Sequence, residues 1–236
     1  VSLMDDKKQL AVILLAAGQG VRLGGQRKFD LQINGVRYLD HLITLFAGFS
    51  DQIIVAISEE DLELLTPAQR ALPCQFVVGG ATRQISFEKA LAETKADFVL
   101  LHEVARPLVS PDLISKVIAA SRHHKAVAAA VQIPVRDSLA LHENGHIKDI
   151  IPRDKLVLLQ TPQIFENDLI RSLMTSAAEK GWITDSLVTL ARKAGIDVFF
   201  VAGEEANLKV TYPEDILKVD EIAIRQALAQ KDQHDG

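Results

Sequence analysis

Three cationic side chains and four glycines lie close together in a loop near the start of the chain. The loop runs from Ala16 to Lys28, and its cations Arg22, Arg27 and Lys28 fall within seven residues. Glycines let backbone N–H groups approach phosphate oxygens, and fixed cations neutralise phosphate charge. In a chain whose net charge is −5, this concentration predicts a site for a polyphosphate.

The loop matches neither of two common phosphate-binding motifs. Phe29, rather than Ser or Thr, follows Lys28, which excludes a P-loop. Leu23 stands where the third glycine of a dinucleotide-binding fingerprint belongs. A solvated surface loop is the alternative. However, an apolar run, Leu10 to Leu15, precedes the loop, and open α/β sheets bind ligands at the carboxyl ends of their strands. The position therefore favours a ligand site.

Further sequence blocks follow in an order that resembles one enzyme family. The loop itself, from Leu15 to Gly24 with Lys28, is similar to the signature of nucleotidyltransferases that activate sugars and sugar alcohols. The other blocks are Gly79-Gly80-Ala-Thr-Arg83-Gln-Ile-Ser86, His102-Glu103-Val-Ala-Arg106-Pro107, Pro134-Val-Arg-Asp137-Ser138, Arg153, Gln160-Thr161-Pro162-Gln163-Ile-Phe165, Thr184-Asp185 and Asn207-Leu-Lys209-Val-Thr211-Tyr-Pro213-Glu-Asp215. Together they resemble the 2-C-methyl-D-erythritol 4-phosphate cytidylyltransferase family.

The resemblance implies a Mg²⁺-dependent transfer of a cytidylyl group from CTP to a sugar-alcohol phosphate, 2-C-methyl-D-erythritol 4-phosphate. Pyrophosphate is released, and the product feeds isoprenoid-precursor synthesis. The implied catalytic residues are Arg22 and Lys28 on the triphosphate and Lys209 near the α-phosphate or the acceptor phosphate. The implied nucleotide-binding residues are Ala16, Ala17, Gly18, Gly20, Gly80 and Ser86. The acceptor side is implied to hold Arg106, Ser138, Arg153, Thr161 and Thr184, and the metal ligand is implied to be Glu103.

These residue types suit that chemistry. An acceptor phosphate is already anionic, so one of its oxygens can attack the α-phosphorus without a general base. The barrier is largely repulsion between anions and charge build-up, which fixed cations stabilise. We therefore expect one cationic cluster in space, made of Arg22, Arg27, Lys28, Arg106, Arg153 and Lys209.

Four features depart from the family's usual pattern. Glu103 replaces the usual Asp and reaches one methylene further, which matters because Mg²⁺ demands tight octahedral placement. Arg27 replaces the usual Pro before Lys28, in a loop one residue shorter than the commonest form. Ser138 replaces Thr but keeps the hydroxyl. Ala81 stands where many members carry an acidic residue. The catalytic cations are all retained.

Simpler roles stay open for several of these residues. Glu103 and Arg106 are alternatively a structural ion pair at the end of a strand. Lys209 and Arg153 are alternatively solvated surface cations. A lone His at a strand end, such as His102, is interpreted as a hydrogen-bonded structural residue rather than a metal ligand.

Apolar runs alternate with helical patterns along most of the chain. Strands are predicted at 10–15, 53–57, 76–78, 98–101, 127–133 and 198–201, and helices at about 38–49, 83–94 and 111–124, from Asp168 onward and after Pro213. This alternation predicts crossover connections on a parallel sheet. The fold class is therefore α/β, a Rossmann-like, mostly parallel sheet flanked by helices, in a single domain over 1–236.

A projecting β-hairpin arm is predicted at about 137–158. Asn144-Gly145 is a strong tight-turn signal between two short, half-polar runs. A lone hairpin is marginal in water, so we expect the arm to pack on a second subunit. The resemblance implies an arm-exchanged homodimer, which would bring Ser138 and Arg153 into the partner's active site.

Composition excludes several functional classes. The net charge of −5 argues against broad nucleic-acid or membrane-surface binding, and 5% aromatic residues disfavour a base-stacking protein. The single cysteine, Cys74, excludes a disulfide framework within the chain. The polar first residues do not resemble a signal peptide, so a soluble, cytoplasmic protein is expected. The rival functions are a ribitol-5-phosphate cytidylyltransferase, a CTP-binding homologue that has lost turnover, and a structural dimerisation protein.

Overall fold

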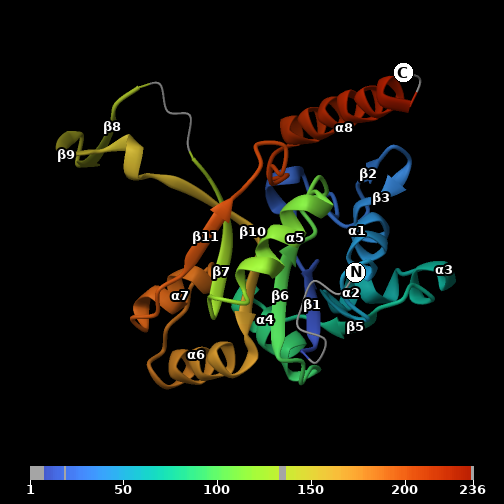
Figure 1. The fold of residues 1–236 in the computed structure, drawn as a ribbon, viewed down its shortest axis with the longest axis horizontal. Helices are drawn as coiled ribbons and strands as arrows, with labels where there is room; N and C mark the ends of the chain where they lie inside the picture. Colours follow the sequence, from blue (N-terminus) through green and yellow to red (C-terminus); the bar gives the residue numbers. More distant parts are fainter. Residues whose placement is uncertain (1–7, 19, 133–136, 235–236) are drawn as a thin grey trace.

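The centre of the molecule is a seven-stranded, mostly parallel sheet, as predicted (Figure 1). The computed structural model describes residues 8–18, 20–132 and 137–234. The strands, in their order across the sheet, are β11 (Phe199–Ala202), β7 (Ala126–Gln132), β10 (Val157–Glu166), β6 (Phe98–Glu103), β1 (Leu10–Leu15), β4 (Gln52–Ile57) and β5 (Gln75–Val78). β1 pairs in parallel with both β4 and β6, whereas β10 runs antiparallel to both of its neighbours.

β10 was not predicted, although it lies between β6 and β7 in the sheet. Its middle reads Gln160-Thr-Pro-Gln163, and polar residues with a proline argue against a central strand. The pairing with β7 shifts register between Gln160 and Gln163. Because the ladder skips the intervening pair, the missing N–H of Pro162 leaves no ladder bond unmade there.

Helices cover the sheet on both faces and define two apolar cores. One core contains side chains of α1 (Tyr38–Ala47), α5 (Pro111–Ala120) and α8 (Pro213–His234), and the other those of α4 (Arg83–Ala92), α6 (Asn167–Glu179) and α7 (Leu187–Lys193). Alternate residues of β1 serve the two cores, with Val12 and Leu14 in the first and Ile13 in the second. Both faces are therefore buried, which explains the uninterrupted apolar sequence of β1.

Short elements fill the connections near the strand ends. They are η1 (Val21–Leu23), β2 (Gln32–Ile33), β3 (Val36–Arg37), α2 (Glu59–Glu63), α3 (Pro67–Arg70) and η2 (Arg153–Lys155). The predicted start of α5 is confirmed, because the Ser110 hydroxyl accepts a hydrogen bond from the backbone N–H of Leu113 at 3.0 Å. This cap satisfies one of the free N–H groups of the first helical turn.

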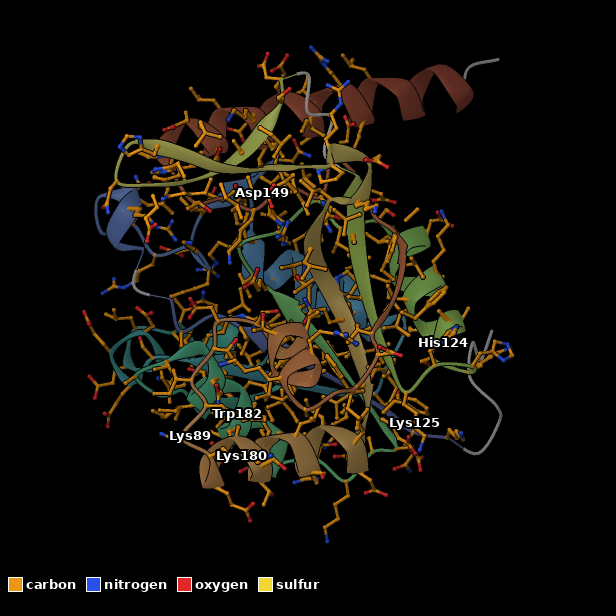
Figure 2. The ribbon with its side chains drawn as sticks, turned by 90° about the vertical axis from the view of Figure 1, so that its left-hand side faces the viewer. Lys89, His124, Lys125, Asp149, Lys180 and Trp182 are labelled. Carbon is orange, nitrogen blue, oxygen red and sulfur yellow. The ribbon has the colours of Figure 1, made fainter. Side chains whose placement is uncertain are left out.

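The predicted hairpin is confirmed and projects away from the main sheet (Figure 1). β8 (Leu139–Glu143) and β9 (His146–Ile151) pair antiparallel, and their turn places Asn144 and Gly145 at φ of 50° and 79°. These left-handed angles suit Asn-Gly. In Figure 2, which is turned so that the arm faces the viewer, Asp149 of β9 lies in the upper part of the molecule and Trp182 in the lower part.

Several predicted boundaries moved, and part of one block cannot be placed. α5 ends at Ala120 rather than near 124, and α4 ends at Ala92 rather than near 94. Ile133 and the residues 134–136 of the quoted block lie outside the described residues. Among the described residues, no helix combines the length and the apolar composition needed to cross a membrane.

Candidate active site

A cavity of about 900 Å³ opens at the carboxyl ends of β1, β4, β5 and β6. Ligands bind in this position in open α/β sheets. The sequence-predicted residues that line the cavity are Ala16, Ala17, Gly18, Gly20, Arg22, Lys28, Gly80, Ser86, Glu103 and Lys209. Every residue predicted to be catalytic, nucleotide-binding or metal-binding therefore faces one space, although these residues come from four separate stretches of the chain.

The glycine loop folds back on itself beside this cavity. Gly20 adopts a φ of 59°, and its carbonyl accepts a hydrogen bond from the N–H of Leu23 at 2.7 Å. A Cβ atom on Gly20 would lie 2.1 Å from the carbonyl oxygen of Gln26, which is far inside van der Waals contact. Only glycine fits this turn. This turn places Arg22 at the cavity, and the Arg22 guanidinium lies 5.5 Å from the centre of the Tyr212 ring.

Backbone rather than side chains forms the wall contributed by the loop after β5. The Gly80 N–H donates to the Ser86 hydroxyl at 3.0 Å, and that hydroxyl donates to the Thr82 carbonyl at 2.9 Å. A Cβ atom on Gly80 would lie 2.2 Å from Cγ2 of Ile85. Lys89 lines the same wall, and its Nζ donates to the Gly79 carbonyl at 3.0 Å. This close-packed backbone can present amide groups to a flat base.

Glu103, at the end of β6, gathers three cations around one carboxylate. Its Oε1 lies 3.0 Å from Arg83 Nε and 2.9 Å from Lys209 Nζ, and its Oε2 lies 3.5 Å from Arg106 Nε. Burial alone would raise the pKa of Glu103, but Lys209, Arg83 and Arg106 together lower it to about 2. The group is therefore a carboxylate at neutral pH, and it fixes cations at the cavity.

The buried side chains of Thr161 and His102 form a hydrogen-bond network next to Glu103. The Glu103 N–H donates to the Thr161 hydroxyl at 3.2 Å, and that hydroxyl lies 3.1 Å from His102 Nδ1. His102 Nε2 lies 3.0 Å from the Arg106 carbonyl, so the neutral ring carries its proton on Nε2 and accepts from Thr161 on Nδ1. The interpretation of His102 as a structural residue is confirmed. This network links β6 to β10.

Lys209 is held in place by its neighbours in the chain. The buried Asn207 side chain donates to the Thr161 carbonyl at 2.8 Å, and the Val210 N–H donates to the Ala105 carbonyl at 2.8 Å. These bonds tie the segment on both sides of Lys209 to the middle of β10 and to the residues that follow β6. Lys209 is therefore not a freely solvated surface lysine.

Lys28 is half-buried and lines the same cavity as Glu103 and Lys209. Burial lowers its pKa, and the positive charge of Lys209 lowers it further, while Glu103 opposes both effects. When an anion binds, it stabilises a partly buried cation more than it stabilises a fully solvated one. This arrangement points to a polyanionic ligand.

The protein offers Mg²⁺ few ligands of its own. Within the described ranges, no group of three or more His, Cys, Asp and Glu side chains is placed to hold a metal ion. Glu103 commits Oε1 to Arg83 and Lys209, while Oε2 has only the longer Arg106 contact. One available carboxylate oxygen fits an ion that takes its other ligands from phosphates and water, which is how Mg²⁺ commonly binds.

The five acceptor-side residues do not line the cavity of this chain. Thr161 is buried in the network behind Glu103, and the Arg106 guanidinium donates to the Asn207 carbonyl at 2.8 Å. Ser138 and Arg153 are exposed on the arm. The Thr184 hydroxyl closes a turn with Ser186 before α7. Their predicted contact with an acceptor therefore stays a prediction.

The expected cationic cluster is only partly formed. Arg27 turns to α2, where its Nη2 lies 3.0 Å from Glu60 Oε1 and its Nε lies 2.5 Å from Asp61 Oδ1. The charge of Arg27 is thus neutralised by carboxylates of the protein itself. Arg83 and Lys89, to which no role was given, line the cavity instead. Arg83 follows the Thr82 cap directly, and its presence in the Gly79–Ser86 block was a signal that could have identified it.

Comparisons with known proteins support the family resemblance of the sequence blocks. A model of the family described as 2-C-methyl-D-erythritol 4-phosphate cytidylyltransferase matches residues 10–225. A Dinoroseobacter shibae protein named bifunctional enzyme IspD/IspF is 39% identical over 215 residues, which cover 89% of this chain and 52% of that protein. The chain thus spans about half the length of this relative.

A relative of similar length and a solved structure agree with this match. The 2-C-methyl-D-erythritol 4-phosphate cytidylyltransferase of Thermus thermophilus is 32% identical over 215 residues, covering 91% of this chain and 97% of the relative. A crystal structure of a T. thermophilus enzyme of the same name superimposes with a TM-score of 0.78 at 30% identity, covering 91% of this chain and 98% of that one.

Proposed function

The chain belongs to the 2-C-methyl-D-erythritol 4-phosphate cytidylyltransferase family, and from this premise we propose how its residues divide the reaction. The enzyme transfers the cytidylyl group of CTP to 2-C-methyl-D-erythritol 4-phosphate and releases pyrophosphate. The family model and the relatives carry that acceptor in their names, which favours it over ribitol 5-phosphate. The observation that carries the proposal is the single cavity where the glycine loop, the Gly79–Gly80 wall and the cations meet.

The chemical step needs positioning and charge stabilisation more than proton transfer. An oxygen of the acceptor phosphate attacks the α-phosphorus of CTP, and the bond from that phosphorus to the oxygen bridging the α- and β-phosphates breaks. The electron pair leaves with pyrophosphate. Negative charge builds on the α-phosphate oxygens and on the leaving group, so fixed cations lower the barrier.

Three cations take separate parts in this step. Arg22 and Lys28, on the glycine loop, hold the β- and γ-phosphates and stabilise the pyrophosphate as it leaves. Lys209, on the segment tied to β6 and β10, lines the same cavity and stabilises the α-phosphate. Backbone groups of Ala16, Ala17 and Gly18, with Gly80 and Ser86, form the cytidine pocket. Glu103 pairs with Arg83, Arg106 and Lys209 and so holds these cations together against their mutual repulsion.

Mg²⁺ is the proposed metal, and Glu103 is its protein ligand. The ion supplies charge neutralisation of the triphosphate when bound. The carboxylate of Glu103 is ionised at neutral pH and has one oxygen with only a long contact, which supports this role. Since its cationic neighbours repel a bare ion, Mg²⁺ binding should require CTP.

The acceptor side is proposed to be completed by a second copy of the chain. Ser138 and Arg153 are carried on the arm and do not line this chain's own cavity. Apolar side chains on the arm are exposed, with Leu141, Ile147 and Ile150 exposed by 54%, 66% and 59%. A homodimer through the arm would bury them. A cytoplasmic location stays a prediction.

One assay tests the proposal. The protein is incubated with CTP, Mg²⁺ and either 2-C-methyl-D-erythritol 4-phosphate or ribitol 5-phosphate, and pyrophosphate is measured. We expect release with the erythritol phosphate and much less with ribitol phosphate. Release with ribitol phosphate alone would transfer the assignment to the rival acceptor. CTP binding without release under either acceptor would indicate a homologue that has lost turnover.

A further inference from the structure

Arg27 lies next to Lys28 but its side chain points to α2 rather than into the cavity. Its Nε lies 2.5 Å from Asp61 Oδ1 and its Nη2 lies 3.0 Å from Glu60 Oε1. The Asp61 side chain is only 10% exposed, whereas that of Glu60 is 80% exposed. Because water screens exposed pairs strongly, the pair with Asp61 is the stronger of the two.

Asp61 is itself fixed to the cavity wall. The Asp61 N–H donates to the hydroxyl of Ser58, the N-cap of α2, at 3.1 Å. Ser58 and Glu59 both line the cavity. The Arg27–Asp61 pair therefore joins two of its walls, the glycine loop after β1 and the start of α2 after β4.

Between Leu23 and Lys28 the loop is held by short-range backbone bonds, from the Gly25 N–H to the Gly20 carbonyl at 3.2 Å and from the Gln26 N–H to the Leu23 carbonyl at 3.3 Å. Leu23 and Phe29 are buried, at 2% and 4% exposure, but the four residues 24–27 between them are exposed. Gly24 and Gly25 adopt φ of 66° and 85°, and a Cβ atom on either would meet nothing within 4 Å. The backbone hydrogen bonds of this stretch stay within the loop, so the Arg27 ion pairs are the side-chain contacts that tie it to α2. Lys28 is thus flanked by two fixed neighbours, Arg27 on α2 and Phe29 in the core.

We infer that Arg27 is a positioning residue that holds the phosphate-binding loop in its nucleotide-ready form through Asp61. This inference rests on the proposed function, because it assumes that Lys28 contacts the triphosphate of CTP. Without this ion pair the loop samples other conformations. The apparent affinity for CTP then falls in proportion to the fraction of molecules whose loop is in the binding conformation. Once CTP is bound, its phosphates hold Lys28 in place, so the chemical step proceeds as before.

The test compares Arg27→Ala, Asp61→Asn and the double variant with the wild-type protein. We expect KM for CTP to rise about tenfold in each single variant, with kcat within about twofold of wild type. The double variant should show no further rise, because both substitutions remove one interaction. Calorimetric titration with CTP alone should show the same weakening. Hydrogen exchange of the nucleotide-free protein should be faster at residues 24–28.

Arg37→Ala is the matched control. Arg37 also pairs with a helix-borne carboxylate, with its Nε 3.1 Å from Asp40 Oδ2, but neither residue lines the cavity. Its kinetics should match wild type. An unchanged KM in Arg27→Ala, additive effects in the double variant, or a loss confined to kcat would each overturn the inference while wild type still releases pyrophosphate. A wild-type protein that binds no CTP would instead overturn the proposed function.

Discussion

Lys28 and Lys209 line the same cavity from different parts of the chain, and the charge of Lys209 makes the charge of Lys28 harder to keep. Burial and Lys209 both lower the pKa of Lys28. Glu103 offsets this cost by pairing with Lys209 at 2.9 Å and with Arg83 at 3.0 Å. The free protein thus carries a concentration of positive charge that a triphosphate would neutralise further. The clustered positive charge therefore both attracts the nucleotide and lowers the stability of the free protein.

Substitution of Lys28 should therefore separate activity from stability. In Lys28→Ala we expect kcat/KM to fall about 10²–10³-fold, as for the loss of one preorganised charge-stabilising group. The melting temperature should be unchanged or higher, because the repulsion from Lys209 is relieved. Pyrophosphate release and thermal unfolding are the two measurements. Lys116→Ala removes a lysine paired with Asp112 on α5, outside the cavity, and should change neither. Near-normal turnover in Lys28→Ala would remove this residue from the mechanism.

His102 should make stability depend on pH. Burial lowers its pKa to about 4, and its bond to the Arg106 carbonyl only partly opposes this. Between pH 6.5 and 4 the unfolded chain binds a proton that the folded protein does not, so stability falls as pH falls through this window. The loss should reach at most about 3 kcal/mol. Urea unfolding at pH 7, 6 and 5 measures it.

The control for this pH dependence is His102→Gln, whose amide can still donate to the Arg106 carbonyl. The variant should be less stable at pH 7 but should lose stability more slowly on acidification. Glu103 does not interfere, because its pKa is depressed to about 2. The stability that it contributes is present above its ordinary pKa of 4.5 and is lost only as pH falls from there toward 2. Equal slopes in the variant and in wild type would contradict the assignment.

At the scale of the element, the glycine loop offers a comparison between two left-handed positions. Gly20 and Gly24 have φ of 59° and 66°, but only at Gly20 would a Cβ meet backbone, 2.1 Å from the Gln26 carbonyl. Gly20→Ala should displace the turn that carries Arg22 and weaken CTP binding at least about tenfold. Gly24→Ala bears only the conformational cost of about 1–2 kcal/mol. Titration with CTP separates the two, and equal effects would show that strain alone matters.

The elements also show how far the sequence could be read. The parallel strands, the hairpin and the start of α5 were predicted because each has a local signal, such as an apolar run, Asn-Gly or Ser-Pro. β10 was missed because its polar residues are satisfied by distant segments. The Gln160 side chain donates to the Glu204 carbonyl at 2.8 Å, and the Thr161 carbonyl accepts from Asn207. Local sequence cannot show such partners.

The same limit applied to the site. Its cavity-lining residues could be predicted because each stands in a block with backbone or charge requirements that a family repeats. Arg27 was expected in the cationic cluster because it shares the loop with Arg22 and Lys28. Its actual partners, Glu60 and Asp61, are more than thirty residues away in sequence. The composition suggested a basic cluster, but only the fold decides which cations face a ligand.

At the scale of the whole molecule, the arm and the cavity are separate features of one chain. Figure 1 shows β8 and β9 standing away from the sheet, and the acceptor-side residues Ser138 and Arg153 accompany them. If two copies exchange arms, each active site contains Lys28 of one chain and Arg153 of the other. Isologous exchange gives two equivalent sites per dimer. If the arm acts within its own chain, both residues of a site belong to one copy.

Mixed dimers distinguish these arrangements. Lys28→Ala and Arg153→Ala, each nearly inactive alone, are co-expressed with different tags, and the doubly tagged species is purified. In exchanged dimers one of the two sites combines intact Lys28 with intact Arg153, so a mixed dimer should recover about half of the wild-type activity, and an unpurified mixture about a quarter. The site that carries both substitutions stays inactive. Pyrophosphate release is measured per dimer, and sedimentation confirms the oligomeric state.

Restoration of activity requires that the arm reach the partner's cavity. A mixed dimer no more active than its parents would place Arg153 outside the partner's site and in the site of its own chain.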